Sequence, residues 1–181
     1  MLTIFLIGVS LASVRIKNLT NTTAAIKKKF LEIKQDQGLL LEIAEVSIEN
    51  FQGFARSGKN PSTGQMFPKL SKGWVGYRHH LLKTNKESSF FLGADSTKSN
   101  LTFTGNLLNS IKAKIDSSKG RVSFYAKGTH PGYGDGKPKQ SNQEIVDDLA
   151  TRGFEFMVVG EKLKKRINVL VKRFIRKTLT R

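Results

Sequence analysis

The C-terminal part of the chain has the clearest periodic pattern of apolar residues, over residues 161–178. Six apolar residues recur there at i, i+4, i+7, i+8, i+11 and i+12: Leu163, Ile167, Leu170, Val171, Phe174 and Ile175. This spacing places them on one face of an α-helix. The other positions are rich in cations: Lys162, Lys164, Lys165, Arg166, Lys172, Arg173, Arg176 and Lys177. The pattern predicts a long C-terminal helix with one apolar and one basic face.

Two further helices are predicted near the N-terminus. The first begins at Thr22 or Thr23, either of which can cap it, and ends at Lys34. Its apolar face consists of Ile26, Phe30 and Ile33. After a break at residues 36–38, the second covers residues 39–54. Its apolar stripe consists of Leu40, Ile43, Ala44, Ser47, Ile48 and Phe51, and its outer face carries Glu42, Glu45 and Glu49. We expect an antiparallel helical hairpin that covers one face of a sheet.

The centre of the chain, residues 101–127, predicts a β-hairpin. Residues 111–115 extend an apolar helical face that begins at Leu107, but they also alternate apolar and polar side chains as a strand does. A turn cluster follows at residues 116–120, and residues 121–127 alternate again. We expect a short helix or bend at residues 105–110 and then a hairpin that pairs residues 111–115 with 121–127.

The first fourteen residues, 1–14, contain no charged side chain. They are too few to span a membrane as a helix, which takes about 20 residues. Leu11-Ala12-Ser13 could be a signal-peptidase site, but no basic residue precedes the apolar run as a secretory signal requires. The β-branched content favours a buried strand, or an apolar arm that adds to the sheet of a neighbouring molecule.

Two segments, residues 55–100 and 128–142, are predicted to be extended loops because Gly, Pro, Ser and Asn are frequent in them. Within the first, residues 74–83 fit a helical turn. After the second, Ser141 and Glu144 predict a capping box at the start of a short helix that Gly153 ends. Residues 154–159 predict an edge strand or an extended lead-in to the last helix.

Together these elements predict a single domain over residues 1–181, of the α/β and more specifically the α+β class. A small, mainly antiparallel sheet is flanked by the N-terminal helical pair and by the long basic C-terminal helix. A chain of 181 residues, 38% of them apolar, is long enough for one sizeable core.

The charge of the chain, +17 from 31 basic and 14 acidic residues, implies an acidic or polyanionic partner. The basic helix could follow DNA phosphates, bind an acidic membrane face or dock on an acidic protein ring. It could also be the solvated outer face of a helix that packs on the core. No zinc finger, helix-turn-helix or RNP pattern points to readout of a base sequence.

The residues predict no catalytic chemistry. The chain has no cysteine, which excludes a disulfide, a thiol nucleophile and a cysteine zinc site. The aspartates are scattered, and His79, His80 and His130 do not have the spacing of metal ligands. In the loop around Lys137 the residue after the lysine is Pro138, where a phosphate-binding loop has Ser or Thr. We therefore expect no enzyme activity, no cofactor and no metal.

One string of residues resembles a known family. The sequence LTFTGNLLNSI, residues 101–111, is similar to the L-x-x-T-G-x-L-x-x-S-I signature of the virion-morphogenesis proteins of tailed bacteriophages, which complete the tail or form the neck. The Gly-rich G-x-x-W/F-x-P-L loop of that family has its nearest match at residues 64–70, and its Tyr-Ala strand end matches Tyr125-Ala126. The order and spacing of these pieces agree from about Thr22 to the end of the chain.

The resemblance implies a structural subunit of a neck or tail-completion ring, which joins the head connector to the tail by binding and not by catalysis. It implies a homo-oligomeric ring in the virion, assembled in the host cytoplasm, with portal-adaptor and tail-tube or tail-terminator proteins as neighbours and no membrane partner. The basic helix would face an acidic partner ring or the DNA in the channel. The expected loop contacts are Phe67, Leu70, Trp74, His130, Tyr133, Lys137 and Lys139. The alternative is a basic nucleic-acid-binding protein that acts through residues 161–181 and 74–83.

Overall fold

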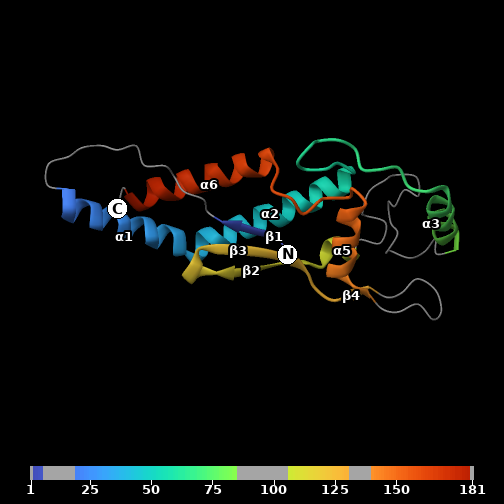
Figure 1. The fold of residues 1–181 in the computed structure, drawn as a ribbon, viewed down its shortest axis with the longest axis horizontal. Helices are drawn as coiled ribbons and strands as arrows, with labels where there is room; N and C mark the ends of the chain where they lie inside the picture. Colours follow the sequence, from blue (N-terminus) through green and yellow to red (C-terminus); the bar gives the residue numbers. More distant parts are fainter. Residues whose placement is uncertain (1, 6–18, 85–105, 131–139, 180–181) are drawn as a thin grey trace.

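The computed structural model describes residues 2–5, 19–84, 106–130 and 140–179 (Figure 1). Its helices are α1 (Leu19–Gln35), α2 (Gln37–Ser57), α3 (Lys72–Thr84), α4 (Asn106–Asn109), α5 (Asn142–Thr151) and α6 (Glu161–Leu179). Its strands are β1 (Leu2–Phe5), β2 (Ile111–Asp116), β3 (Arg121–Ala126), β4 (Thr129–His130) and β5 (Gln140–Ser141). Helices thus surround a small antiparallel sheet, and the predicted α+β class is confirmed.

The main sheet has three strands in the order β1-β3-β2. Strands β2 and β3 form the predicted hairpin, with Ile111 opposite Ala126 and Asp116 opposite Arg121. Helix α4 precedes it, as expected for the short helix before the hairpin. Strand β1 pairs antiparallel with β3 of the same chain, from Leu2 opposite Phe124 to Phe5 opposite Arg121. The predicted strand is therefore present at Leu2–Phe5, where it pairs within the chain; residues 6–14 lie outside the described residues.

Helix α2 is the central element of the core. Its apolar stripe packs against β2 and β3 on one side and against α6 on the other. Phe51 of α2 meets Phe124 of β3 edge to face, with ring centroids 5.2 Å apart, and both side chains are fully buried. Leu163 of α6 is fully buried as well. The helix ends at Gly58, whose φ of 69° lets its N–H reach the carbonyls of the last turn.

Helices α1 and α2 do not form the predicted antiparallel hairpin. Only Asp36 separates them, and its side chain caps α2 by accepting a hydrogen bond of 2.8 Å from the Leu39 N–H. One residue is too short to reverse the chain, since such loops have about 2–5 residues. Figure 1 shows α2 continuing from α1 with a bend, while α6 runs beside both. Because α1 is not folded back on α2, Ile26 and Leu31 stay 43% and 51% exposed, and of its predicted apolar face only Ile33 is buried.

The two predicted loops are shorter than expected. Residues 55–57 belong to α2, and residues 72–84 form α3, so the helical turn expected at residues 74–83 is present and is longer than predicted. Ser71 explains the start of α3, because its hydroxyl accepts from the Trp74 N–H at 3.2 Å as a helix cap. In the second segment β4 and β5 pair, which brings its two ends together. Residues 85–100 and 131–139 lie outside the described residues.

The end of the chain follows the prediction closely. Ser141 and Glu144 make the capping box that starts α5, and Gly153, with φ of 84°, follows its last turn. Residues 154–159 are an extended lead-in to α6 and not an edge strand. Phe156 and Met157 of the lead-in are buried in the core.

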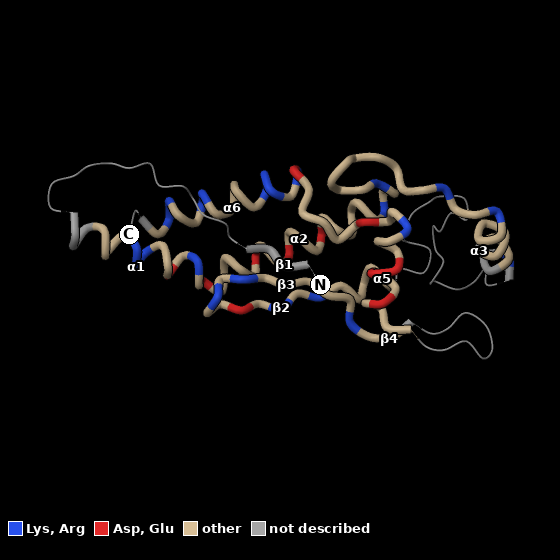
Figure 2. The backbone as a smooth tube through the Cα atoms, in the orientation of Figure 1, with Lys and Arg blue, Asp and Glu red and all other residues tan. Residues whose placement is uncertain are grey.

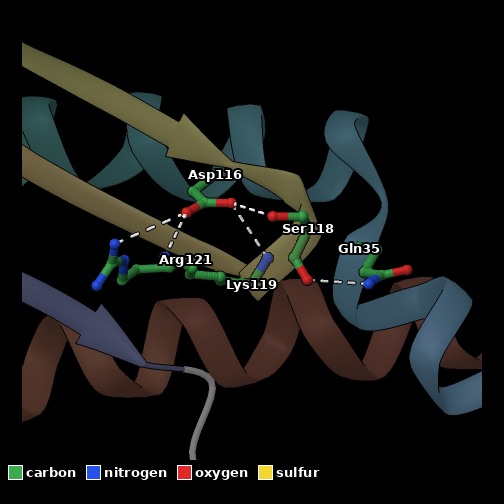
Figure 3. A network of polar contacts seen from close by, with 5 residues as sticks. All are labelled: Gln35, Asp116, Ser118, Lys119 and Arg121. Atoms are coloured by element: carbon green, nitrogen blue, oxygen red, sulfur yellow. Dashed lines mark hydrogen bonds and ion pairs between the residues drawn. The ribbon is translucent and has the colours of Figure 1, made fainter.

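The turn of the β2–β3 hairpin is tied to the end of α1 (Figure 3). The Asp116 carboxylate accepts hydrogen bonds from the Ser118 hydroxyl at 2.6 Å and from the Lys119 N–H at 3.2 Å. The Gln35 side chain of α1 donates to the Ser118 carbonyl at 3.0 Å. Gly120, with φ of 58°, lies so close that a Cβ atom there would be 2.7 Å from the carbonyl oxygen of Lys34. These contacts fix the direction of α1 relative to the sheet.

The substitution Phe51→Ala removes the aromatic side chain that joins α2 to β3. We expect it to lower the free energy of unfolding by about 3–5 kcal/mol, because a large buried side chain leaves a cavity. Urea denaturation measures the loss. Leu41→Ala is the matched control on the same helix, since Leu41 is 50% exposed, and it should change stability by about 0.5 kcal/mol or less. Equal effects of the two substitutions would contradict the central place of α2.

The hairpin turn predicts a dependence of stability on pH. The hydrogen bond from Ser118, with help from the Lys119 N–H and the nearby Lys119 and Arg121 charges, lowers the pKa of Asp116 below its usual value. The charged carboxylate therefore stabilises the fold above about pH 4, and this contribution disappears as the pH falls through the folded-state pKa. Asp116→Asn should be less stable than the wild type at pH 7, and the difference between their melting temperatures should vanish in acid. A difference that stays constant with pH would argue against a stabilising charge on Asp116.

Candidate interaction surfaces

Helix α6 has the two faces that its sequence predicts. On the apolar face Leu163 and Ile167 are buried, while Leu170, Val171, Phe174 and Ile175 are half-buried against the core. The cations follow the rest of the helix from its first turn to its last (Figure 2). The basic face, defined here as the eight predicted cations of α6, is exposed throughout.

Two cations of the basic face are bound to α2. Arg166 pairs with Glu49 at 2.8 Å, and Arg173 pairs with Glu42. The two glutamates are seven positions apart on α2, and the two arginines are seven positions apart on α6. Because the helices run antiparallel, the earlier glutamate meets the later arginine and both pairs form at once. Exposed pairs of this kind contribute about 0–1 kcal/mol each. This edge of the basic face therefore serves packing inside the chain.

Four other lysines of the basic face are not paired with glutamates of α2. Lys164 pairs with Glu161 within α6 at 2.7 Å, and this hydrogen bond is the main reason why the pKa of Glu161 is lowered. Lys162 lies 6.0 Å from the centre of the Phe54 ring. Within the part of the chain that the structure describes, Lys165 and Lys172 have no carboxylate at ion-pair distance. These two lysines are the part of the basic face best placed to meet an acidic partner.

An apolar hollow lies in the middle of this basic surface. Its volume is about 330 Å³, and Val46, Lys165, Arg166, Val169 and Leu170 line it between α2 and α6. Val169 is 65% exposed although cations surround it in sequence. The apolar pattern of the sequence did not predict this hollow, because Val169 lies off the apolar stripe of α6. The shallow form and the few polar groups fit a side chain of another macromolecule better than a small polar ligand.

Phe67 belongs to the core and not to a contact surface. It is 4% exposed, and its ring centroid lies 5.5 Å from that of Phe154 in the lead-in to α6. The loop around Phe67 follows the lead-in closely, because Cβ atoms added at Gly153 and Gly160 would lie 3.3 Å from Pro68 and 1.9 Å from the Pro61 carbonyl oxygen. The prediction that Phe67 touches a neighbouring subunit is corrected on this ground.

The other predicted contacts that the structure describes lie on separate elements. Leu70 is half-buried at the end of the same loop. Trp74 is 38% exposed on α3 and stacks on Tyr77, with ring centroids 5.4 Å apart. His130 lies in β4, whereas Tyr133, Lys137 and Lys139 lie outside the described residues. The predicted contact surfaces that lie mostly within the described residues are therefore α3 and the basic face.

Helix α3 lies at one end of the elongated molecule, apart from the sheet (Figure 1). None of its residues whose exposure is described is buried. Its charged residues, Lys72, Arg78 and Lys83, are all basic, and the exposed His79 and His80 belong to the same helix. A helix with an exposed tryptophan and charged residues that are all basic is typical of a binding element and not of a core element.

Metal and membrane chemistry find no support in the described residues. Nowhere in residues 2–5, 19–84, 106–130 and 140–179 do three or more His, Asp or Glu side chains gather as metal ligands. Over the same residues, every helix is too short or too polar to span a bilayer.

Comparisons with protein-family models, with curated proteins and with solved structures give no match to this chain.

The ion pairs between α2 and α6 can be tested by a double-mutant cycle. Glu49→Ala and Arg166→Ala, alone and together, should give a coupling energy of about 0.2–1 kcal/mol in urea denaturation, decreasing with added salt. The matched cycle of Glu49→Ala with Lys172→Ala should give no coupling, because Lys172 lies elsewhere on the same helix. A coupling for Lys172 equal to that for Arg166 would mean that only the general charge balance matters.

Proposed function

We propose that this protein is a structural subunit of a neck or tail-completion ring of a tailed bacteriophage and joins the head connector to the tail during virion assembly. It acts by binding: copies of the chain form a ring, and the ring meets the portal-adaptor side and the tail side. The protein has no catalytic role in this proposal, and it resides in the virion after assembly in the host cytoplasm.

The position of α3 is the observation that carries the proposal. A helix of 13 residues is marginally stable alone in water, and those side chains of α3 whose exposure is described are exposed or half-buried. A ring closes by heterologous contacts, in which each copy presents one surface to the copy before it and a different surface to the copy after it. An outlying helix on which the exposed Trp74 stacks on the half-buried Tyr77 is suited to such a contact.

The string that resembles the phage family signature, residues 101–111, supports the proposal through the place of its described residues in the fold. Leu107, Ser110 and Ile111, three of its signature positions, are buried where the chain turns from α4 into β2. The Ser110 hydroxyl donates to the Leu107 carbonyl at 2.7 Å and closes this turn. The Tyr-Ala match, Tyr125-Ala126, ends the paired strand β3. The resemblance thus involves positions that build the hairpin, as expected of a signature that specifies a fold.

The alternative, a nucleic-acid-binding protein that acts through α6 and α3, has weaker support. Arg166 and Arg173 are already bound to glutamates of α2, which leaves fewer cations for phosphates. The exposed Lys165 and Lys172, together with the basic α3, are the residues through which such binding would occur. It would fall steeply with salt, because each neutralised phosphate releases counterions.

Electron microscopy of a lysate from phage that lack this gene tests the proposal. We expect DNA-filled heads and finished tails that remain separate, and joined particles again when the wild-type gene is supplied. Complementation by the double variant Lys165→Glu and Lys172→Glu, which leaves both α2–α6 ion pairs in place, shows whether the outer part of the basic face takes part. Joined, normal particles in the absence of the gene would remove the ring proposal, and salt-dependent binding to duplex DNA would then support the alternative.

A further inference from the structure

We propose that α3 of one copy docks on the acidic surface of α5 in a second copy and buries Trp74 there. The acidic surface is defined by Glu144, Asp147 and Asp148. This inference rests on the proposed ring, because it names the two surfaces through which neighbouring copies would meet.

The first argument is the composition of α3. Trp74 and Tyr77 are three residues apart, so they lie on one helix face, and their rings stack with an angle of 22° between the planes. Met66, in the loop that leads to α3, is 64% exposed. Tryptophan and tyrosine in the centre of an interface commonly supply much of its binding energy. This end of the molecule therefore presents apolar surface that a partner can bury.

The second argument is charge complementarity. Helix α3 has three Lys or Arg residues and no Asp or Glu. In α2, Glu42 and Glu49 are already paired with arginines of α6. On α5 all three carboxylates are exposed. Glu144 accepts from the Ser141 N–H in the capping box, and Asp148 pairs with Arg152 at 2.8 Å. Asp147 accepts from the neutral Gln143 amide at 2.9 Å and has no cation at ion-pair distance among the described residues. Among the described helices, α5 is thus the acidic surface best suited to a basic helix (Figure 2).

The third argument is that the partner is a second copy. Figure 1 shows α3 set apart from α5 of its own chain. A chain with a net charge of +17 repels its own copies unless unlike patches meet. A basic α3 and an acidic α5 are two different surfaces of one molecule, which is the arrangement that a heterologous contact needs.

The fluorescence of the full-length chain tests the docking directly, because Trp74 is its single tryptophan. Emission spectra and light scattering are recorded on the same samples as the protein concentration rises. We expect the emission of Trp74 to shift to shorter wavelength over the concentration range in which oligomers form. An oligomer whose Trp74 emission does not shift would overturn the docking and leave the ring proposal standing. A chain that stays monomeric at all concentrations would also overturn the docking, whereas the ring proposal is decided by the particles that lack the gene.

The role of the acidic surface is tested by removing two of its negative charges. Asp147→Asn keeps an oxygen for the hydrogen bond from Gln143, and combined with Asp148→Asn it should raise the concentration at the midpoint of the shift about tenfold, equivalent to about 1.4 kcal/mol. Glu45→Gln on α2 is the matched control, an exposed carboxylate outside the acidic surface, and should leave the midpoint unchanged. Equal effects of the two changes would overturn the assignment to α5.

Because the chain has no cysteine, a disulfide between copies tests the same contact independently of charge. His79→Cys and Asp148→Cys are made in separate chains and mixed under mild oxidation. We expect covalent heterodimers from this mixture and few from a mixture of His79→Cys with Glu45→Cys. Equal yields from both mixtures would overturn the docking.

Discussion

The apolar stripe of α2 is the constraint on which the rest of the structure depends. The stripe is too wide for one neighbour to cover, so the helix needs the sheet on one side and α6 on the other. Phe51 reaches the sheet at Phe124, and α6 brings Leu163 to the opposite side. The N-terminal strand β1 then extends the sheet at β3. Burial of this stripe gives the hydrophobic gain, and the strands and helices around it take the positions that burial requires.

The same packing explains why part of the charge excess is structural. Two antiparallel helices with glutamates and arginines at matched spacing bring Glu42 to Arg173 and Glu49 to Arg166. The cations toward α2 are thereby neutralised, while Lys165 and Lys172 remain outside these pairs. Within the described residues, α3 carries a further group of basic residues at the end of the molecule, on a different element from the basic face of α6. A partner that recognises this protein meets several basic surfaces, one of them aromatic.

Periodicity within the sequence predicted α2, α6 and the hairpin well, because each buries a regular stripe of its own residues. It failed where the answer depends on contacts between distant segments. The break at Asp36 suggested a reversal of the chain, but the hairpin turn at Gly120 rests on the end of α1 and fixes a bend instead. The helical turn expected at residues 74–83 is part of the longer α3, whose start at Lys72 the sequence pattern did not predict because Gly73 and Gly76 interrupt it, although Ser71 was an available capping signal. Local patterns also do not identify Phe154 as the residue against which Phe67 packs, because the two lie far apart in the sequence.

The arrangement of a rigid core with an outlying aromatic helix favours a protein that works by assembly. The proposed ring subunit would be a permanent part of the phage particle. Quantitative mass spectrometry of purified, joined phage particles measures this most directly. The account predicts that the protein is present at a constant ratio to the portal protein in every preparation, as a closed ring requires. Its absence from joined particles, together with its presence in the lysate that produced them, would contradict the account.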